Sequence, residues 1–385
     1  MPTQAVLKKA RGIGRADERE LWARAGGCCE FQGCNKLVYK SEVTHERVNV
    51  AELAHIYAFS AAGTRGNKGL RNKKKLNSVS NLLLVCRGCH KNIDKTGAAT
   101  KYSVELLQGW KRTHEDRIRR VVQIDPKRNS HVVIYGGKIG ATQPALDPML
   151  AMSAMFPLWY PADDRAIDLK MECSHEDKTP EFWKTEEAHL RKIVNEQIGP
   201  RTREAKPGHF SIFAIADQPL LTLLGTLIPS LIRAVVYQPH RNPDNWAWAP
   251  PPHKFKFIVN RPANTAAFPA LVFSLSSPVA PNRITTALGA TASIWELTSS
   301  KPGTDSIRSS RQLADFRDAA RALIDEIYAA HPGLTHLPIF QVMPASCAVT
   351  LGRLHLPKAD KPWILYDQNN KLGGFVPALE IKPTP

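Results

Sequence analysis

Two closely spaced pairs of cysteines near the start of the chain constrain its fold more than any other sequence feature. Four residues separate Cys29 from Cys34, and two separate Cys86 from Cys89. Two tight turns that each present a pair of thiolates form the tetrahedral ligand set of structural zinc. Cys28 is an alternative to Cys29 in the first pair. The spacing therefore predicts one structural Zn²⁺ that joins two segments far apart in the sequence.

The composition is that of a globular protein with more than one domain. The chain has 385 residues, of which 43% are hydrophobic and 23% are charged, and these values exclude a disordered or coiled-coil chain. The longest apolar stretch, 219–236, is interrupted by Pro229 and Arg233, so we expect no membrane span. No apolar segment typical of a signal peptide is visible near the N-terminus. We therefore expect a cytoplasmic protein whose cysteines bind metal or remain free thiols.

The positive charge is concentrated in the first third of the chain. Residues 1–130 hold 26 Lys and Arg against 12 Asp and Glu, whereas the remainder holds 26 against 23. A basic block of this kind favours a phosphate-rich partner, and a solvated basic surface is the alternative. Charge and cysteine content change together, so we predict domains at 1–123 and 131–385, joined by a linker at 124–130.

The first part reads as a small α+β domain. Apolar patterns predict strands near 48–56 and 82–85, and helices near 17–25, 88–95 and after Ser103. His55 ends the first strand, Asn81 precedes the second, and His90 directly follows Cys89. Asp94 is four residues after His90, on the same face of the expected helix.

This order of residues resembles the HNH endonucleases, which have a ββα-metal fold. The resemblance is carried by 54–56, 81–86 and 86–94. It implies that His55 is the general base that activates water against a phosphodiester. It also implies that Asn81 clamps the connecting loop and that His90 ligates a catalytic divalent metal, usually Mg²⁺. A histidine that titrates near neutral pH and a bound cation suit this chemistry.

The sequence departs from the HNH pattern at one position. Many members of that family carry Asp or His immediately before the base, as a second metal ligand, and this chain has Ala54. Glu52, Asp94 or water would then complete the metal shell. A structural, non-catalytic zinc module that only grips DNA is the alternative function.

Basic residues near the HNH-like motif are the expected DNA contacts. The loop at 65–75 and the helix at 111–120 are expected to hold the phosphate backbone of double-stranded DNA without reading sequence. We single out Arg71, Lys73, Lys74 and Lys75 as DNA-binding residues.

The second part alternates strand and helix patterns, which favours an α/β fold. It also contains an internal echo. The segments 212–215 and 224–227 recur as 339–342 and 351–354, at an offset of 127 residues throughout. We predict two similar α/β halves related by pseudo-symmetry, with a chance likeness of apolar segments as the alternative.

This part resembles the SAVED domain, a fusion of two CARF-like halves. The resemblance is carried by 210–225, by 237–241 with Trp246 and Trp248, and by 344–353. The order HNH then SAVED resembles effectors of CBASS anti-phage systems. That resemblance implies activation by a cyclic di- or trinucleotide and assembly into a homo-oligomer. The residues expected to bind this second messenger are Gln218, Arg241, Trp246, Lys301 and Ser346.

Two other functions remain open at the level of sequence. One is a restriction-type HNH endonuclease whose C-terminal domain recognises a DNA sequence or a modified base. The nearly neutral charge of 131–385 argues against a large DNA-reading surface there. The other is a zinc-dependent DNA-binding regulator with a small-molecule sensor.

Overall fold

The chain divides into two units between residues 124 and 125. The computed structural model describes residues 12–66, 72–95, 97–142, 144–170, 173–202, 208–251, 254–289 and 291–382, with Lys73 and Lys74 described by their backbone alone. In this part of the chain, no helix has the length and apolar character needed to cross a bilayer.

The first unit is built around one hairpin and the helix that follows it. Its elements are α2 (Arg15–Ala25), β1 (Ala51–His55), α3 (Lys73–Leu76), a 3₁₀ turn (Val79–Asn81), β2 (Leu82–Cys86), α4 (Arg87–Asp94), α5 (Ala98–Lys101) and α6 (Val104–Val122). Strands β1 and β2 pair antiparallel, with Ala51 opposite Cys86 and His55 opposite Leu82. This β–β–α order confirms the predicted α+β metal-binding fold.

Local sequence explains the limits of these helices. Gly26 ends α2 with a left-handed φ of 61°, a conformation that costs glycine little. The Ser103 side chain accepts a hydrogen bond from the Leu106 amide and so caps α6. The residues at 82–85 are all buried and form the centre of the unit's core.

The second unit is an α/β domain with two large sheets and a two-stranded hairpin of β8 and β9. Its elements are β3 (Asn129–Gly136), α7 (Pro148–Met155), β4 (Tyr160–Pro161), β5 (Ile167–Asp168), α8 (Pro180–Gln197), α9 (Gly199–Thr202), β6 (Phe210–Ile215), α10 (Gln218–Leu227), β7 (Ala234–Val236), β8 (His240–Arg241), β9 (Asp244–Asn245), β10 (Phe257–Asn260), β11 (Phe268–Ser274), α11 (Pro281–Leu288), β12 (Ala292–Ser299), α12 (Ser310–Ala330), β13 (Leu337–Val342), α13 (Ala345–Leu354), β14 (Trp363–Asn369) and β15 (Gly374–Ile381). Strand β3 begins inside the expected linker 124–130.

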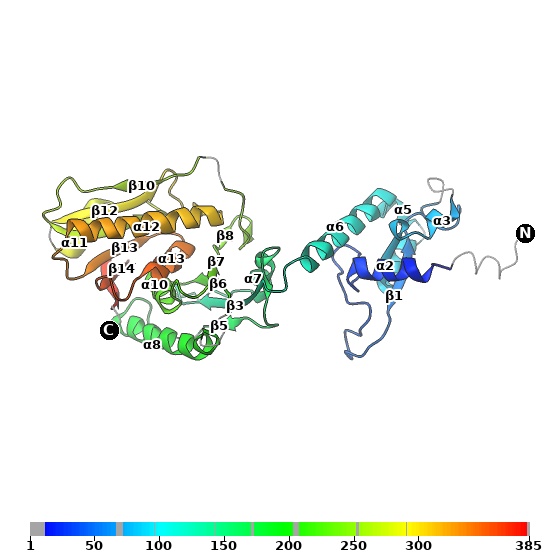
Figure 1. Ribbon diagram of the computed structural model, residues 1–385, viewed down its shortest axis with the longest axis horizontal. Helices are drawn as coiled ribbons and strands as arrows, with labels where there is room; N and C mark the ends of the chain where they lie inside the picture. Colours follow the sequence, from blue (N-terminus) through cyan, green and yellow to red (C-terminus); the bar gives the residue numbers. More distant parts are fainter. Residues whose placement is uncertain are drawn as a thin grey trace, which may run out of the picture. The chain divides into compact units, whose positions relative to one another are not determined.

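Each half of the second unit contributes one sheet. The first sheet has the order β4-β3-β6-β7, with β5 also paired to β3, and its neighbouring strands are parallel. The second has the order β10-β12-β11-β13-β14-β15, parallel in the middle and antiparallel at both edges. Figure 1 shows α10 and α13 side by side where the halves meet.

The two halves cross at a pair of glycines. A Cβ on Gly225 would lie 2.1 Å from the carbonyl oxygen of Val349, and one on Gly352 would lie 1.9 Å from that of Thr222. Both pairs follow the offset of 127 residues between the two echoes. Glycine is required here because the backbones of α10 and α13 touch. The structure therefore has the two pseudo-symmetric halves that the echo predicts.

The pseudo-symmetry extends to an aromatic trio in each half. In both halves a phenylalanine ring stacks on a tyrosine ring, with ring centroids 4.4 Å apart. A third aromatic ring contacts the same phenylalanine edge-on, with centroids 5.3 Å apart. The members are Phe213, Tyr237 and Trp246 in the first half and Phe340, Tyr366 and Phe375 in the second. Trp246 therefore occupies a core position that the second half gives to Phe375.

Candidate functional site

The first unit gathers four cysteine sulfurs at one point. The Sγ atoms of Cys29, Cys34, Cys86 and Cys89 all lie within 4.8 Å of one another, and those of Cys34 and Cys86 are 3.9 Å apart. A tetrahedral zinc ion with Zn–S bonds of about 2.3 Å requires sulfurs about 3.8 Å apart, so this ligand set fits zinc. Cys28 lies outside the cluster, and its Sγ contacts the carbonyl oxygen of Gly26 at 3.6 Å.

The two knuckles arise from local turns. In the first, the Cys29 amide donates to Lys36 O at 2.8 Å and the Cys34 amide to Phe31 O at 3.0 Å, which folds the segment back on itself. In the second, Cys86 is the N-cap of α4 and Cys89 lies in its first turn. The cysteine cluster thereby includes the start of the helix that carries His90.

His55 lies at the end of β1 with one ring nitrogen occupied. Its Nε2 is 3.0 Å from Oδ1 of Asn77. Because a side-chain carbonyl oxygen accepts, Nε2 carries the proton and Nδ1 keeps a lone pair that can take a proton from water. Sequence reasoning missed Asn77, which lies in a loop with no pattern of its own.

Asn81 ties together the loop that follows β1. Its side chain is buried, its Oδ1 accepts from the Tyr57 amide at 2.8 Å, and its Nδ2 donates to the carbonyl oxygens of Leu76 at 2.8 Å and Tyr57 at 3.1 Å. In addition, the Ile56 amide donates to the Asn81 carbonyl oxygen at 2.8 Å. These bonds close the loop at the point where His55 leaves the strand.

His90 and Asp94 form a polar pair on α4. Nε2 of His90 is 3.5 Å from Oδ2 of Asp94, and their side chains are 30% and 47% exposed. An imidazole nitrogen and a carboxylate oxygen at this separation suit a divalent cation with further positions open to water and substrate. Ala54, in contrast, is completely buried and offers no ligand atom.

Two of the basic residues expected to hold DNA are instead part of the core. The Arg65 side chain is only 2% exposed and pairs with Asp94. Lys111 is buried and lies 2.6 Å from Glu115 and 3.7 Å from Glu30, because the buried carboxyl of Glu30 requires a cation beside it. Burial also raises the pKa of Glu30 to about 7.

Of the four basic residues singled out for DNA binding, one has a described side chain. Lys75 is exposed, consistent with a surface role. Arg71 and the side chains of Lys73 and Lys74 lie outside the described residues. Arg87, Lys91 and Lys95 are exposed on or beside α4, close in sequence to His90.

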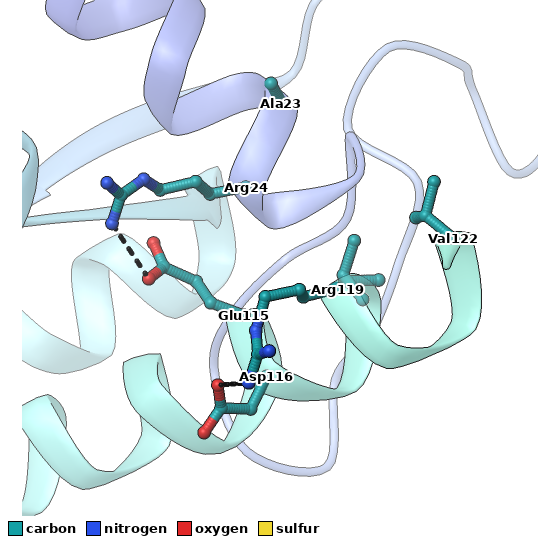
Figure 2. Close-up of a pocket in the computed structure, with 7 residues that line it drawn as sticks. Ala23, Arg24, Glu115, Asp116, Arg119 and Val122 are labelled. Carbon is teal, nitrogen blue, oxygen red and sulfur yellow. Dashed lines mark hydrogen bonds and ion pairs between the residues drawn. The ribbon is translucent and has the colours of Figure 1, made fainter. Parts of the chain in front are cut away.

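A pocket of about 500 Å³ between α2 and α6 has balanced charges. Figure 2 shows Arg24 directed at Glu115 and Arg119 directed at Asp116 across its wall. The ion-pair distances are 3.7 Å and 2.8 Å. Arg24 and Arg119 thus each have an anionic partner, whereas Arg112, Arg117 and Arg120 of α6 are exposed.

The residues expected to bind a nucleotide are not gathered at one site. The Gln218 amide forms a double hydrogen bond with the backbone of Met343, at 3.0 and 3.2 Å. Ser346 is buried, and its amide donates to Gln238 at 3.0 Å. These two positions lie at the amino ends of α10 and α13, on either side of the boundary between the halves.

The other three expected nucleotide ligands lie elsewhere. Trp246 is buried in the aromatic trio of the first half, so the expectation that it stacks on a base is wrong. Arg241 and Lys301 are exposed, on β8 and after β12. Core packing determines the position of Trp246. Its ring packs edge-on against Phe213 of β6, as the ring of Phe375 packs against Phe340 of β13 in the other half.

A charged cluster between the halves was not expected. Nζ of Lys178 lies 2.6 Å from Asp367, which is in β14, and 3.6 Å from Asp217, which follows β6. Burial and the neighbouring Asp367 carboxylate raise the pKa of Asp217. A cavity of about 560 Å³ adjoins this cluster and is lined in part by Lys138, Lys178 and Lys371. No local signal marks Lys178, whose partners are distant in sequence.

The fold and site define a small ββα module with a tetracysteine cluster, followed in the sequence by a two-half α/β domain. Residues 29–96 match the family model for HNH endonucleases. Residues 190–381 match the model for SAVED, the SMODS-associated and fused to various effectors sensor domain. The chain therefore carries one segment that matches an HNH endonuclease domain and a second segment that matches a SAVED sensor domain.

Solved structures of low identity are similar to part of the chain. The Acinetobacter baumannii Cap4 SAVED/CARF-domain containing receptor with the cyclic trinucleotide 2'3'3'-cAAA is 13% identical, with a TM-score of 0.44 over 72% of this chain and 56% of that one. The Moraxella osloensis Cap4 receptor is 12% identical, with a TM-score of 0.41 over 74% and 64%. The chain thus spans less than two thirds of these receptors. No curated protein matches it.

Proposed function

We propose that this protein is a cyclic-oligonucleotide-activated, metal-dependent endonuclease. It degrades double-stranded DNA with little sequence specificity, in the cytoplasm, as the effector of anti-phage abortive-infection defence. The observation that carries the proposal is the joining, in one chain, of an HNH domain that keeps His55, Asn81 and His90 to a SAVED sensor domain.

His55 is the general base of the proposed reaction. Asn77 holds the proton on Nε2, so Nδ1 accepts the proton of the water that attacks the phosphodiester. Asn81 keeps the loop after β1 closed and thereby fixes the direction of the imidazole. Loss of Asn77 or Asn81 would leave His55 in place, but its imidazole would no longer be held in the orientation that the reaction needs.

The two proposed metals beside α4 have separate roles. Zn²⁺ on Cys29, Cys34, Cys86 and Cys89 is structural and couples folding of the first unit to metal binding. His90 would hold Mg²⁺ or a similar divalent ion at the other site. When bound, that ion supplies stabilisation of the negative charge that develops on the phosphate and the leaving oxygen.

The lack of sequence specificity follows from the kind of surface near the site. Arg87, Lys91 and Lys95 are exposed along α4, and with the lysines at 73–75 they would contact phosphates. Cations on the backbone position a duplex but carry no information about its bases. We therefore expect cleavage at many sites, with an affinity that falls steeply with salt.

The activator is proposed to bind between the two SAVED halves. Ligands of open α/β sheets bind outside the carboxyl ends of the strands, and Lys138, Lys178 and Lys371 line a cavity at the ends of β3 and β14. Glu176 and Asp177 also line this cavity, and Lys178 and Lys371 already pair with Asp367 and Glu176, so the phosphates of a cyclic di- or trinucleotide would replace these carboxylates as partners of the ammonium groups. If the ligand binds a homo-oligomer of the protein more tightly than it binds the single chain, it shifts the equilibrium between the two toward the homo-oligomer.

The test is plasmid degradation by the purified protein with Mg²⁺ and a panel of cyclic di- and trinucleotides. We expect no cleavage without a nucleotide and strong cleavage with one panel member. His55→Ala should abolish cleavage while zinc content and nucleotide binding stay unchanged. Robust cleavage by nucleotide-free wild type would reject the proposal in favour of a restriction-type enzyme, and DNA binding without cleavage under all conditions would favour a regulator.

A further inference from the structure

Arg65 is a buried cation in the loop that connects β1 to α3. Its guanidinium donates four hydrogen bonds: Nε to the Ile56 carbonyl oxygen at 2.7 Å, Nη1 to that of Ile93 at 2.7 Å, and Nη2 to that of His55 at 3.1 Å and to Asp94 Oδ1 at 2.9 Å. Only a planar guanidinium presents enough donors in a fixed geometry for this set.

These bonds join the two elements on which the reaction depends. His55 and Ile56 end the strand that carries the general base, while Ile93 and Asp94 form the last turn of α4, the helix that carries His90. The zinc cluster fixes the other end of α4. Arg65 therefore holds the end of α4 that the cysteines do not reach.

Asp94 uses its two oxygens differently. Oδ1 accepts from Arg65, whereas Oδ2 faces Nε2 of His90 at 3.5 Å. Two neighbouring ligands of an octahedral ion with bonds of about 2.1 Å are about 3.0 Å apart, so a small rotation brings this pair to a metal. Metal-binding carboxylates are commonly held by a hydrogen bond to the oxygen that does not bind.

The residue immediately before His55 offers no ligand atom. Position 54, where related nucleases carry a ligand before the base, is a completely buried alanine. We propose that Asp94 is the second protein ligand of the catalytic metal and that Arg65 is the positioning residue that aims it. This inference rests on the nuclease activity proposed above.

Manganese binding tests the inference without DNA or activator. The zinc-loaded full chain is titrated with Mn²⁺, and free Mn²⁺ is measured by electron paramagnetic resonance. We expect Asp94→Asn to weaken binding about 10- to 100-fold and Arg65→Lys about 10-fold. The double variant should bind no more weakly than Asp94→Asn alone, because Arg65 acts on the metal through Asp94.

The exposed pair Asp116 and Arg119 on α6 supplies matched controls. Asp116→Asn and Arg119→Lys make the same chemical changes away from the site and should leave Mn²⁺ affinity unchanged. Unchanged affinity in Asp94→Asn would remove Asp94 from the metal site. Unchanged affinity in Arg65→Lys, with a lowered melting temperature, would make Arg65 a purely structural residue. If the wild type did not cleave DNA, that result would count against the proposed function. The Mn²⁺ affinities of the variants would still decide whether Asp94 binds the metal and whether Arg65 positions it.

Discussion

Replacing Gly352 with alanine should force α10 and α13 apart where their backbones touch. The new Cβ would lie 1.9 Å from the carbonyl oxygen of Thr222 and 2.9 Å from Cα of Gly225. Both are main-chain atoms of a buried helix, so no side-chain rotation can relieve the overlap. Overpacking a core costs about 1–3 kcal/mol, and we expect about 3 kcal/mol here. At roughly 2–4 °C per kcal/mol for a unit of this size, the melting temperature should fall by about 6–12 °C.

Calorimetry on the full chain measures this effect, because the two units are expected to unfold in separate transitions. Gly225→Ala should cost about as much, since its Cβ would lie 2.1 Å from Val349 O. Together the two substitutions should cost less than their sum, because helices already displaced by one methyl accept the second. Gly303→Ala, with no atom within 4 Å, is the control and should shift stability by less than about 0.5 kcal/mol. A melting temperature for Gly352→Ala equal to that of the control would refute the reasoning.

Three further predictions concern the metal, a buried acid and the basic surface. Cys86→Ser should release zinc and unfold the first unit alone, which elemental analysis and calorimetry would detect; zinc retained at one equivalent contradicts it. Asp217 has a pKa raised from 3.8 to about 8 by burial and by Asp367. The native state therefore keeps a proton that the unfolded chain releases, so stability falls as pH rises from about 4 to 8. Asp217→Asn should flatten this slope in urea unfolding, and an unchanged slope would assign it to another group. Lys75→Ala should reduce the slope of log affinity for DNA against log salt by about 1, whereas an unchanged slope would place Lys75 away from DNA.

Local patterns predicted the parts of the fold that local interactions determine. The cysteine spacing led to the metal cluster, because each knuckle is a single turn whose ligands are neighbours in sequence. The offset of 127 residues led to the two halves, because both helices need a glycine at the same crossing. In the first unit the strand ending at His55 and the helix carrying His90 follow from short apolar runs.

Residues whose partners are distant in sequence could not be placed in this way. Lys111 looks like one more surface cation of α6, yet the buried Glu30 draws it into the core. Trp246 looks like a stacking platform, yet it completes an aromatic trio with Phe213. Lys178 has a left-handed φ of 63° and meets Asp367 across the two halves, and nothing in its neighbourhood signals either feature.

The two halves of the sensor domain are alike in backbone but differ in the chemistry at the two ends of their boundary. At one end, Gln238 accepts a hydrogen bond from the Ser346 amide. At the pseudo-equivalent end, Asp367 lies with Lys178 beside Asp217. A dimer of identical halves has to repeat the same groups at both ends, whereas a single polypeptide can vary each end independently. Fusion thus gives the boundary a direction, because Gln238 and Ser346 meet at one end and Lys178 and Asp367 at the other.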